Sequence, residues 1–229
     1  MIFENYKNFL SKIKNNKYNF VFFRDFNPKK ESQLILRHDI DLDIDLALEI
    51  AQIEFDLEIK STYFFLLRSD SYNLISDKNL KKVLKIKDLG HEISIHFDLE
   101  IYNNVFEGLD KEIQIFQSYF DVNLDIISIH RPNKDFLEHP SNYFKISTTY
   151  DEIFTKKNIS YYADSGGIFR YGSFIDSYDF QSNNNVQLLL HPIWWTIKSN
   201  DVNSIVKKLI KSRSHSLLNH YKSNIKTLK

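Results

Sequence analysis

The sequence contains no cysteine, which excludes disulfide bonds, thiolate metal sites and a cysteine nucleophile. Glycine and proline are scarce, with 5 and 4 residues, so long flexible linkers are not expected. No run of about eighteen apolar residues occurs, and we therefore expect no membrane-spanning helix. Lysine plus arginine equals aspartate plus glutamate at 30 each, so binding to nucleic acid or another polyanion would require a local basic patch.

The hydrophobic content is sufficient for one large core. Hydrophobic residues make up 42% of the 229 residues, and a single α/β domain of this length is ordinary. We expect one domain over residues 1–229, with a motif-bearing core at about 34–195 and a closing helix at about 201–227. Glu4, Lys7, Lys12 and Lys14 interrupt the first sixteen positions, which lack the apolar segment of a secretory signal. A cytoplasmic protein is the resulting expectation.

Short apolar runs alternate along the chain with segments of helical periodicity. Strands that alternate with helices predict an α/β fold with a parallel sheet covered by helices. Gly90 is expected to end one of the helices. The strands are expected at 34–37, 61–67, 92–95, 126–129, 147–150, 161–163 and 186–190, and the main helices at 46–57, 79–89, 101–120 and 201–227.

The first cluster of polar residues follows the first of these strands. Asp39 and Asp41 come directly after it, with Asp43 and Asp45 close behind. A helix N-cap explains Asp43 or Asp45. It explains Asp39 less well, because a carboxylate at the mouth of a buried strand is desolvated and requires a cation beside it.

A second cluster ends the strand at 92–95, where His96 follows the strand and His91 precedes it. Taken alone, His96 has the pattern of an ordinary loop histidine, and His91 that of a supporting or capping residue. Parallel strands in a barrel end on one shared face, so His96 is expected to meet Asp41 there. Imidazole and carboxylate ligands together suit a divalent metal such as zinc.

Three further strand ends carry polar side chains. Arg131 follows a strand and can hold a carboxylate by two parallel hydrogen bonds, although a surface ion pair is the common fate of a lone arginine. Asp164 stands before a glycine pair and is equally consistent with a tight turn. His191 ends an apolar strand and is suited to proton exchange near neutral pH. Trp194 and Trp195 follow it, either as core residues or as a stacking surface for a sugar ring.

Together these motifs resemble the polysaccharide deacetylase (NodB homology) family, the fourth family of carbohydrate esterases. The resemblance extends from about residue 34 to 195, and the motifs stand in the order that the family uses. The segments that carry it are Arg37-His38-Asp39-Ile40-Asp41, Gly90-His91-Glu92-Ile93-Ser94-Ile95-His96, His130-Arg131-Pro132, Asp164 and Leu189-Leu190-His191.

The resemblance implies a distorted (β/α)7 TIM-like barrel and a metal-dependent hydrolase. It implies that a divalent metal ion, with zinc expected, lowers the pKa of its bound water and polarises an amide carbonyl. The roles implied are Asp39 as general base, Asp41 and His96 as metal ligands, Arg131 as the partner that orients Asp39, His191 as general acid, and Asp164 as the carboxylate that tunes His191.

One position departs from the family pattern. The family supplies a second metal histidine four residues after the first, and Glu100 stands there in this sequence. The third ligand is therefore either Glu100 through oxygen or His130 through nitrogen.

The expected reaction is removal of an N-acyl group, acetyl in the first instance, from an amino sugar of a surface polysaccharide or its precursor. Trp194 and Trp195 are the candidate substrate-binding residues, and no nucleic-acid partner is expected. Two alternatives stay open. One is a hydrolase of another non-peptide C–N bond, such as a formamide, and the other is a degenerate barrel that binds carbohydrate without turnover.

Overall fold

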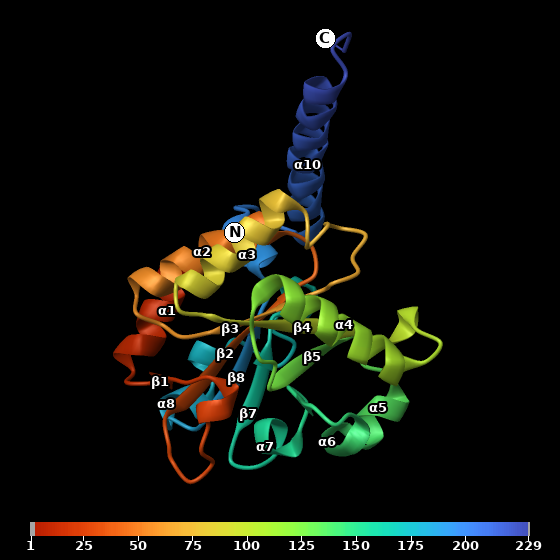
Figure 1. The fold of residues 1–229 in the computed structure, drawn as a ribbon. Coiled ribbons are helices and arrows are strands. Elements are labelled where there is room, and N and C mark those ends of the chain that lie inside the picture. Colours follow the sequence, from red (N-terminus) through yellow and green to blue (C-terminus); the bar gives the residue numbers. More distant parts are fainter. Residues whose placement is uncertain (1–2, 229) are drawn as a thin grey trace.

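The computed structural model describes residues 3–228, and its centre is a sheet in which every strand pairing is parallel (Figure 1). The strand order is β6-β5-β4-β3-β2-β8-β7, with β1 added beside the start of β2. The strands are β1 (Asn19–Phe20), β2 (Gln33–Ile40), β3 (Thr62–Phe65), β4 (Glu92–Asp98), β5 (Ile126–His130), β6 (Ser147–Thr148), β7 (Ser160–Ala163) and β8 (Val186–Leu190).

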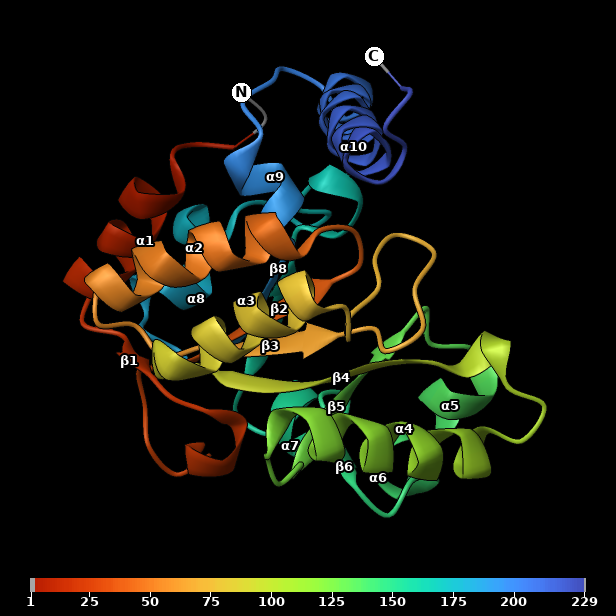
Figure 2. The same cartoon turned by 45° about the horizontal axis from the view of Figure 1, so that its top comes forward.

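Helices connect the strands and cover the outside of the sheet. Figures 1 and 2 show α1, α2 and α3 lying along one side of it, α4 beside β4 and β5, and α10 standing clear of the body. The longer helices are α1 (Tyr6–Asn15), α2 (Ile44–Asp56), α3 (Asp77–Asp88), α4 (Val105–Phe120) and α10 (Val202–Asn224). The short ones are α5 (Lys134–Glu138), α6 (Pro140–Tyr143), α7 (Glu152–Thr155), α8 (Tyr178–Gln181) and α9 (Pro192–Thr196), with 3-10 turns η1 (Phe23–Asp25), η2 (Leu99–Ile101), η3 (Ser165–Gly167) and η4 (Phe174–Asp176).

The sheet curls into an open barrel, which confirms the predicted fold class of a distorted α/β barrel. Seven strands follow one another along the hydrogen-bonded path, and β6 and β7 form its two ends. Within residues 3–228 no strand pairing joins these ends. No helix in the same range is both long and apolar enough to span a membrane.

Strand β2 lies in the middle of the sheet, and all eight of its residues are buried. Because side chains alternate along a strand, its two faces have different neighbours. Leu34, Leu36 and Ile40 belong to the large core beneath the helices. Ile35 belongs to a smaller apolar cluster with Phe64 inside the barrel. Asp39 shares the inner face with Ile35, and this alternation directs it into the barrel.

Two helix boundaries follow from local caps. Asp43 is the N-cap of α2, and its carboxylate accepts from the backbone N–H groups of Asp45 and Leu46, as one sequence interpretation predicted. Gly90 follows the end of α3 with a φ of 89°, a left-handed conformation that glycine adopts without strain. Asp41 lies in the loop between β2 and α2, so the end of β2 and the Asp43 cap of α2 fix this loop on both sides.

Candidate active site

Three potential ligand atoms converge at the carboxyl ends of β2, β4 and β5. The Nε2 atom of His96 lies 3.2 Å from Oδ1 of Asp41 and 3.1 Å from Nδ1 of His130. The third side of the triangle, between His130 Nδ1 and Asp41 Oδ1, is 3.5 Å. The parallel strands end together, so residues far apart in the sequence meet as the strand-end argument predicted.

This triangle fits a divalent metal ion. In a tetrahedral zinc site with ligand bonds of about 2.0–2.2 Å, neighbouring ligand atoms lie roughly 3.3 Å apart. The three distances bracket this value. Asp41 Oδ1 is buried and has no hydrogen-bond donor among the described residues, as expected of an oxygen that faces a cation. Two imidazoles and a carboxylate also form a donor set common to zinc and related metals.

Glu100, the alternative third ligand, lies outside this group. Its side chain is 59% exposed, and its carboxylate lies 3.7 Å from the guanidinium of Arg131. His130, by contrast, belongs to the group with Asp41 and His96, whose ligand atoms all lie within 4.8 Å of one another. Of the two candidates that the sequence left open, His130 is the one placed to coordinate.

Asp39 lies beside the triangle and is held by Arg37 from the same strand. The guanidinium donates from Nε to Oδ1 at 2.9 Å and from Nη2 to Oδ2 at 2.7 Å. Burial alone would raise the pKa of Asp39, but Arg37, with His96, outweighs it and the pKa is lowered. Asp39 is therefore ionised at neutral pH, with Oδ2 3.6 Å from His96 Nε2.

Arg131 does not make the contact with Asp39 that the sequence predicted. Its Nη2 donates to Oδ2 of Asp98 at 2.6 Å, and its side chain is 58% exposed. Arg131 directly follows β5 with a φ of 47°, and its mostly exposed side chain pairs with Asp98 and not with Asp39. We correct this part of the prediction: the arginine that orients Asp39 is Arg37.

On the opposite side of Asp41, His191 and Asp164 form a hydrogen-bonded pair. His191 Nδ1 lies 2.6 Å from Oδ1 of Asp164, and its Nε2 points to Asp41 Oδ2 at 3.7 Å. Asp164 is fully buried and also accepts from the indole N–H of Trp195 at 2.7 Å. Burial alone would lower the pKa of His191, but Asp164 outweighs it and raises the pKa to about 9. His191 is thus protonated at neutral pH, with Nε2 turned toward the site.

The two tryptophans have different positions. Trp195 packs in the core, where its ring stacks on Phe3 at 4.7 Å between centroids and also contacts Tyr6 and Phe9. We therefore correct its expected role from sugar stacking to the support of Asp164. Trp194 is 9% exposed and lines a hollow beside Asp39, Asp41 and His191.

Two hollows meet at Asp41. The smaller, about 250 Å³, lies on the side of His191 and Trp194. The larger, about 900 Å³, lies on the side of His130 and is bounded by Arg68 and Arg131. Asp41 therefore lies between two open spaces, with His130 on the wall of the larger one.

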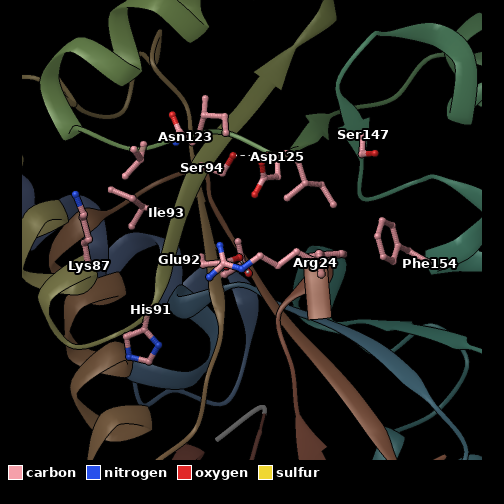
Figure 3. Close-up of a pocket in the computed structure, with 15 residues that line it drawn as sticks. Arg24, Lys87, His91, Glu92, Ile93, Ser94, Asn123, Asp125, Ser147 and Phe154 are labelled. Atoms are coloured by element: carbon pink, nitrogen blue, oxygen red, sulfur yellow. Dashed lines mark hydrogen bonds and ion pairs between the residues drawn. The ribbon is translucent and has the colours of Figure 1, made fainter. Parts of the chain in front are cut away.

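A third cavity, of about 620 Å³, lies at the opposite ends of the strands (Figure 3). It is lined where β3, β4, β5 and β6 begin, and none of the predicted site residues lines it. Its central charges pair with each other, since Arg24 Nη1 lies 2.5 Å from Oε1 of Glu92. This cavity is smaller than the larger hollow at Asp41 and holds none of the candidate metal ligands.

The sequence interpretation assigned no role to Arg37 or His38. His38 lies on the outer face of β2, where Nδ1 lies 3.0 Å from the carbonyl oxygen of Leu190 and Nε2 lies 2.7 Å from Oε1 of Glu54. The signal for Arg37 was its spacing from Asp39. Residues two apart in a strand share a face, so opposite charges there predict an ion pair.

Comparison with known proteins gives fold-level similarities only. No family model and no curated protein matches the chain. Similar solved structures include a family 4 carbohydrate esterase from Bacillus anthracis, with 14% identity, 93% of this chain and 89% of that chain covered, and a TM-score of 0.49. A CE4 family pseudoenzyme from Bacillus anthracis has 13% identity, 81% and 63% coverage and a TM-score of 0.46.

A third similar structure is a family 4 acetyl xylan esterase from Clostridium thermocellum in complex with a cobalt ion. It has 12% identity, 79% of this chain and 84% of that chain covered, and a TM-score of 0.44. At these TM-scores the likeness is loose, and the candidate site stands on its own side-chain geometry.

Proposed function

We propose that the protein is a metal-dependent hydrolase that removes an N-acyl group, acetyl in the first instance, from an amino sugar of a surface polysaccharide or its precursor. The observation that carries this proposal is the convergence of Asp41, His96 and His130 between an ionised Asp39 and a protonated His191. The order of motifs that resembles the polysaccharide deacetylase family supports the same reaction. Action inside the cell, on a soluble or lipid-linked precursor, and a single domain over residues 1–229 belong to the same proposal.

A divalent ion held by Asp41, His96 and His130, with zinc expected, would polarise the amide carbonyl and lower the pKa of a bound water. Asp39 accepts a proton from the attacking water, since Arg37 keeps its carboxylate ionised and oriented. Water adds to the carbonyl carbon, the C–N bond breaks, and His191 donates its Nε2 proton to the departing nitrogen. Asp164 stabilises the protonated form of His191 until that transfer.

Metal content tests the ligand set directly. The purified protein is expected to hold about one ion per chain, and Asp41→Ala, His96→Ala and His130→Ala to lose most of it. Glu100→Ala is the matched control and should keep its metal, because Glu100 faces Arg131 and solvent. Metal retained by the first three variants, or lost from Glu100→Ala alone, would refute the assignment.

Release of free amine tests the reaction. The metal-loaded protein is incubated with N-acetylated sugar nucleotides and, separately, with N-acetylated polymers. Asp39→Asn and His191→Gln should each reduce turnover by about 10²–10⁴-fold, the usual contribution of acid–base groups. Turnover on polymers alone would contradict the precursor substrate. Hydrolysis of simple formamides in preference to amino sugars would favour the alternative C–N hydrolase, and sugar binding that survives Asp39→Asn without any turnover would favour the degenerate barrel.

A further inference from the structure

Helix α10 leaves the body of the protein halfway along its length. Its first turns pack against the body through Ile205 and Leu209, which are 0% and 8% exposed. Beyond Arg213, every described residue from 214 to 228 is exposed. Figure 1 shows this part projecting away from the sheet and the other helices. The projecting part therefore has no partner within residues 3–228, although it carries large apolar side chains.

These apolar side chains form one stripe. Ile210, Leu217, Leu218 and Tyr221 recur at i, i+7, i+8 and i+11, which places them on one side of the helix, and Ile225 directly follows its last residue. They are 42–58% exposed. We call them the α10 stripe. It is distinct from the side that packs on the body, because Ile205 and Leu209 are buried while Ile210 is 58% exposed.

From residue 202 onward the sequence contains seven lysines and arginines and no aspartate or glutamate. Two of them, Lys222 and Lys226, lie in the described projecting part, and Lys207, Lys208, Lys211 and Arg213 lie on the half of α10 nearer the body. Since the whole chain has 30 residues of each sign, the first 201 residues carry an acidic excess of seven. Pairing of two α10 stripes between copies would bring like charges together. A basic helix with one apolar side is instead complementary to an anionic lipid surface, which takes the apolar side chains and the lysines together.

The base of the projecting part is fixed to the mouth of the site. Arg213 donates to Oδ2 of Asp43 from Nε at 3.0 Å and from Nη2 at 2.9 Å, and also to the backbone carbonyls of Leu42 and Ser71. Leu42 and Asp43 directly follow Asp41, and Leu42 and Ser71 line the larger hollow. Whatever binds the α10 stripe is therefore held on the side of the molecule where the hollows open.

We infer that α10 is an interfacial helix that docks on an anionic lipid surface and presents the site to an N-acylated substrate carried on a lipid. The docking rests on the stripe and its charge, and the choice of substrate rests in addition on the proposed hydrolase function. This narrows the substrate from precursors in general to those whose amino sugar is attached to a membrane lipid.

Vesicle flotation with the full chain tests the docking. We expect binding to vesicles of phosphatidylcholine mixed with phosphatidylglycerol, and weak binding to phosphatidylcholine alone. Replacing Leu217, Leu218 and Tyr221 together by Ser should reduce the partition coefficient roughly a hundredfold or more, because burial of each side chain contributes to it. Lys207→Gln, Lys211→Gln and Lys222→Gln should each reduce it roughly fivefold, and added salt should weaken binding by the wild type.

Matched variants on other helices test whether vesicle binding depends on α10 itself or on exposed apolar and basic side chains anywhere on the surface. Ile115→Ser with Tyr119→Ser removes exposed apolar side chains from α4, and Lys78→Gln, Lys81→Gln and Lys85→Gln remove charge from α3. These variants should bind vesicles as the wild type does. The docking would be overturned if both sets of variants lost vesicle binding equally, or if the protein bound neutral and anionic vesicles equally. It would also be overturned if the protein bound no vesicles and formed a dimer in solution that the Ser variant abolished.

A soluble substrate distinguishes the two proposals. The Leu217, Leu218 and Tyr221 variant should hydrolyse a soluble N-acetylated sugar at the wild-type rate and lose rate only on a lipid-linked substrate in vesicles. Vesicle binding without turnover on any substrate would refute the hydrolase and the substrate choice, and leave the docking intact. Turnover on soluble substrate without vesicle binding would refute the docking alone.

Discussion

Arg37 is a fully buried charge whose main partner, Asp39, is also buried. Its guanidinium also donates to Oγ of Ser128 at 2.5 Å and to Oε1 of Gln187 at 3.2 Å. Such a pair adds little net stability over an apolar pair, because both charges lose their hydration. Its removal from one side is costly, however, since the remaining charge is left buried without a counter-charge. Arg37 is thus needed to neutralise the buried Asp39, and the ion pair itself adds little to the stability of the fold.

Arg37→Met is expected to reduce the free energy of unfolding by about 3–5 kcal/mol and to raise the pKa of Asp39, because burial is then opposed only by His96 and His191. Arg131→Met is the matched variant, and its exposed ion pair should contribute about 1 kcal/mol or less. Denaturant titration of both variants measures the difference. Equal losses would show that Arg37 has no special role.

His191 has a pKa raised to about 9, so its proton-donating form persists through neutral pH and is lost as the pH rises through that value. In Asp164→Asn the largest of the attractions that raise the pKa of His191 is removed and only those of Asp41 and Asp39 remain against burial, so the alkaline limb of kcat/KM against pH should move to lower pH. Asp176→Asn, at an exposed carboxylate of η4, should leave the profile unchanged. An unmoved alkaline limb in Asp164→Asn would exclude His191 as the general acid.

At this scale the sequence predicted the residues better than their contacts. Asp41, His96, His130, Asp164 and His191 were selected because each stands at or after the end of a predicted strand, and the ends of parallel strands meet. The partner of Asp39 was missed because the strand was expected to end at residue 37, which hid the face that Arg37 and Asp39 share within β2. The core position of Trp195 depends on which way its side chain turns after β8 ends, and strand order does not determine this.

Helix α2 is attached to the sheet through a buried carboxylate. Glu54 is fully buried, and it accepts hydrogen bonds from the hydroxyls of Tyr6, Ser61 and Tyr63 while it pairs with His38. Burial alone would raise the pKa of Glu54, but His38 outweighs it and the pKa is lowered to about 2. One side chain thus joins α1, α2, β2 and β3.

Glu54→Gln is expected to reduce the free energy of unfolding by about 3–5 kcal/mol at neutral pH, because an amide has one acceptor atom where the carboxylate had two. The carboxylate's contribution is fully present above the ordinary pKa of 4.5 and is lost as pH falls through about 2. The difference between wild type and variant should therefore narrow in acid. Glu49→Gln, on the exposed side of the same helix, should change stability by about 0.5 kcal/mol or less.

The elements themselves were predicted with errors at their ends. The strand expected at 34–37 is β2 (Gln33–Ile40), which continues through Arg37, His38 and Asp39. Charged residues in a row indicate a loop when only local sequence is considered, and here their partners come from distant elements. The helix expected at 101–120 begins later, as α4 (Val105–Phe120), because the Asn104 side chain caps its first turn.

The whole molecule is an open barrel in which a side chain of β8, the strand beside the end strand β7, bonds to the segment that follows β6. Gln187 on β8 donates to the carbonyl of Thr149, just after β6, at 3.1 Å and to that of Phe154 at 2.8 Å. It also accepts from Arg37. The fold class was predictable because alternating strands and helices allow few arrangements. The missing pairing between β6 and β7 was not predictable, because the sequence of neither strand indicates whether the barrel closes.

Gln187→Leu is expected to reduce the free energy of unfolding by at least about 2 kcal/mol, because two buried carbonyls lose their donor. Gln114→Leu on the exposed side of α4 provides the control and should have little effect. The measurement is equilibrium denaturation followed by circular dichroism. A Gln187 variant as stable as the control would show that the barrel ends do not depend on this link.

The placement of Trp194 and Trp195 has a practical consequence for binding studies. They are the only 2 tryptophans in the sequence, one on the wall of the smaller hollow and the other hydrogen-bonded to Asp164. Intrinsic fluorescence excited at the indole band therefore originates beside the candidate site and nowhere else. Ligand titrations can be followed optically in the unlabelled protein.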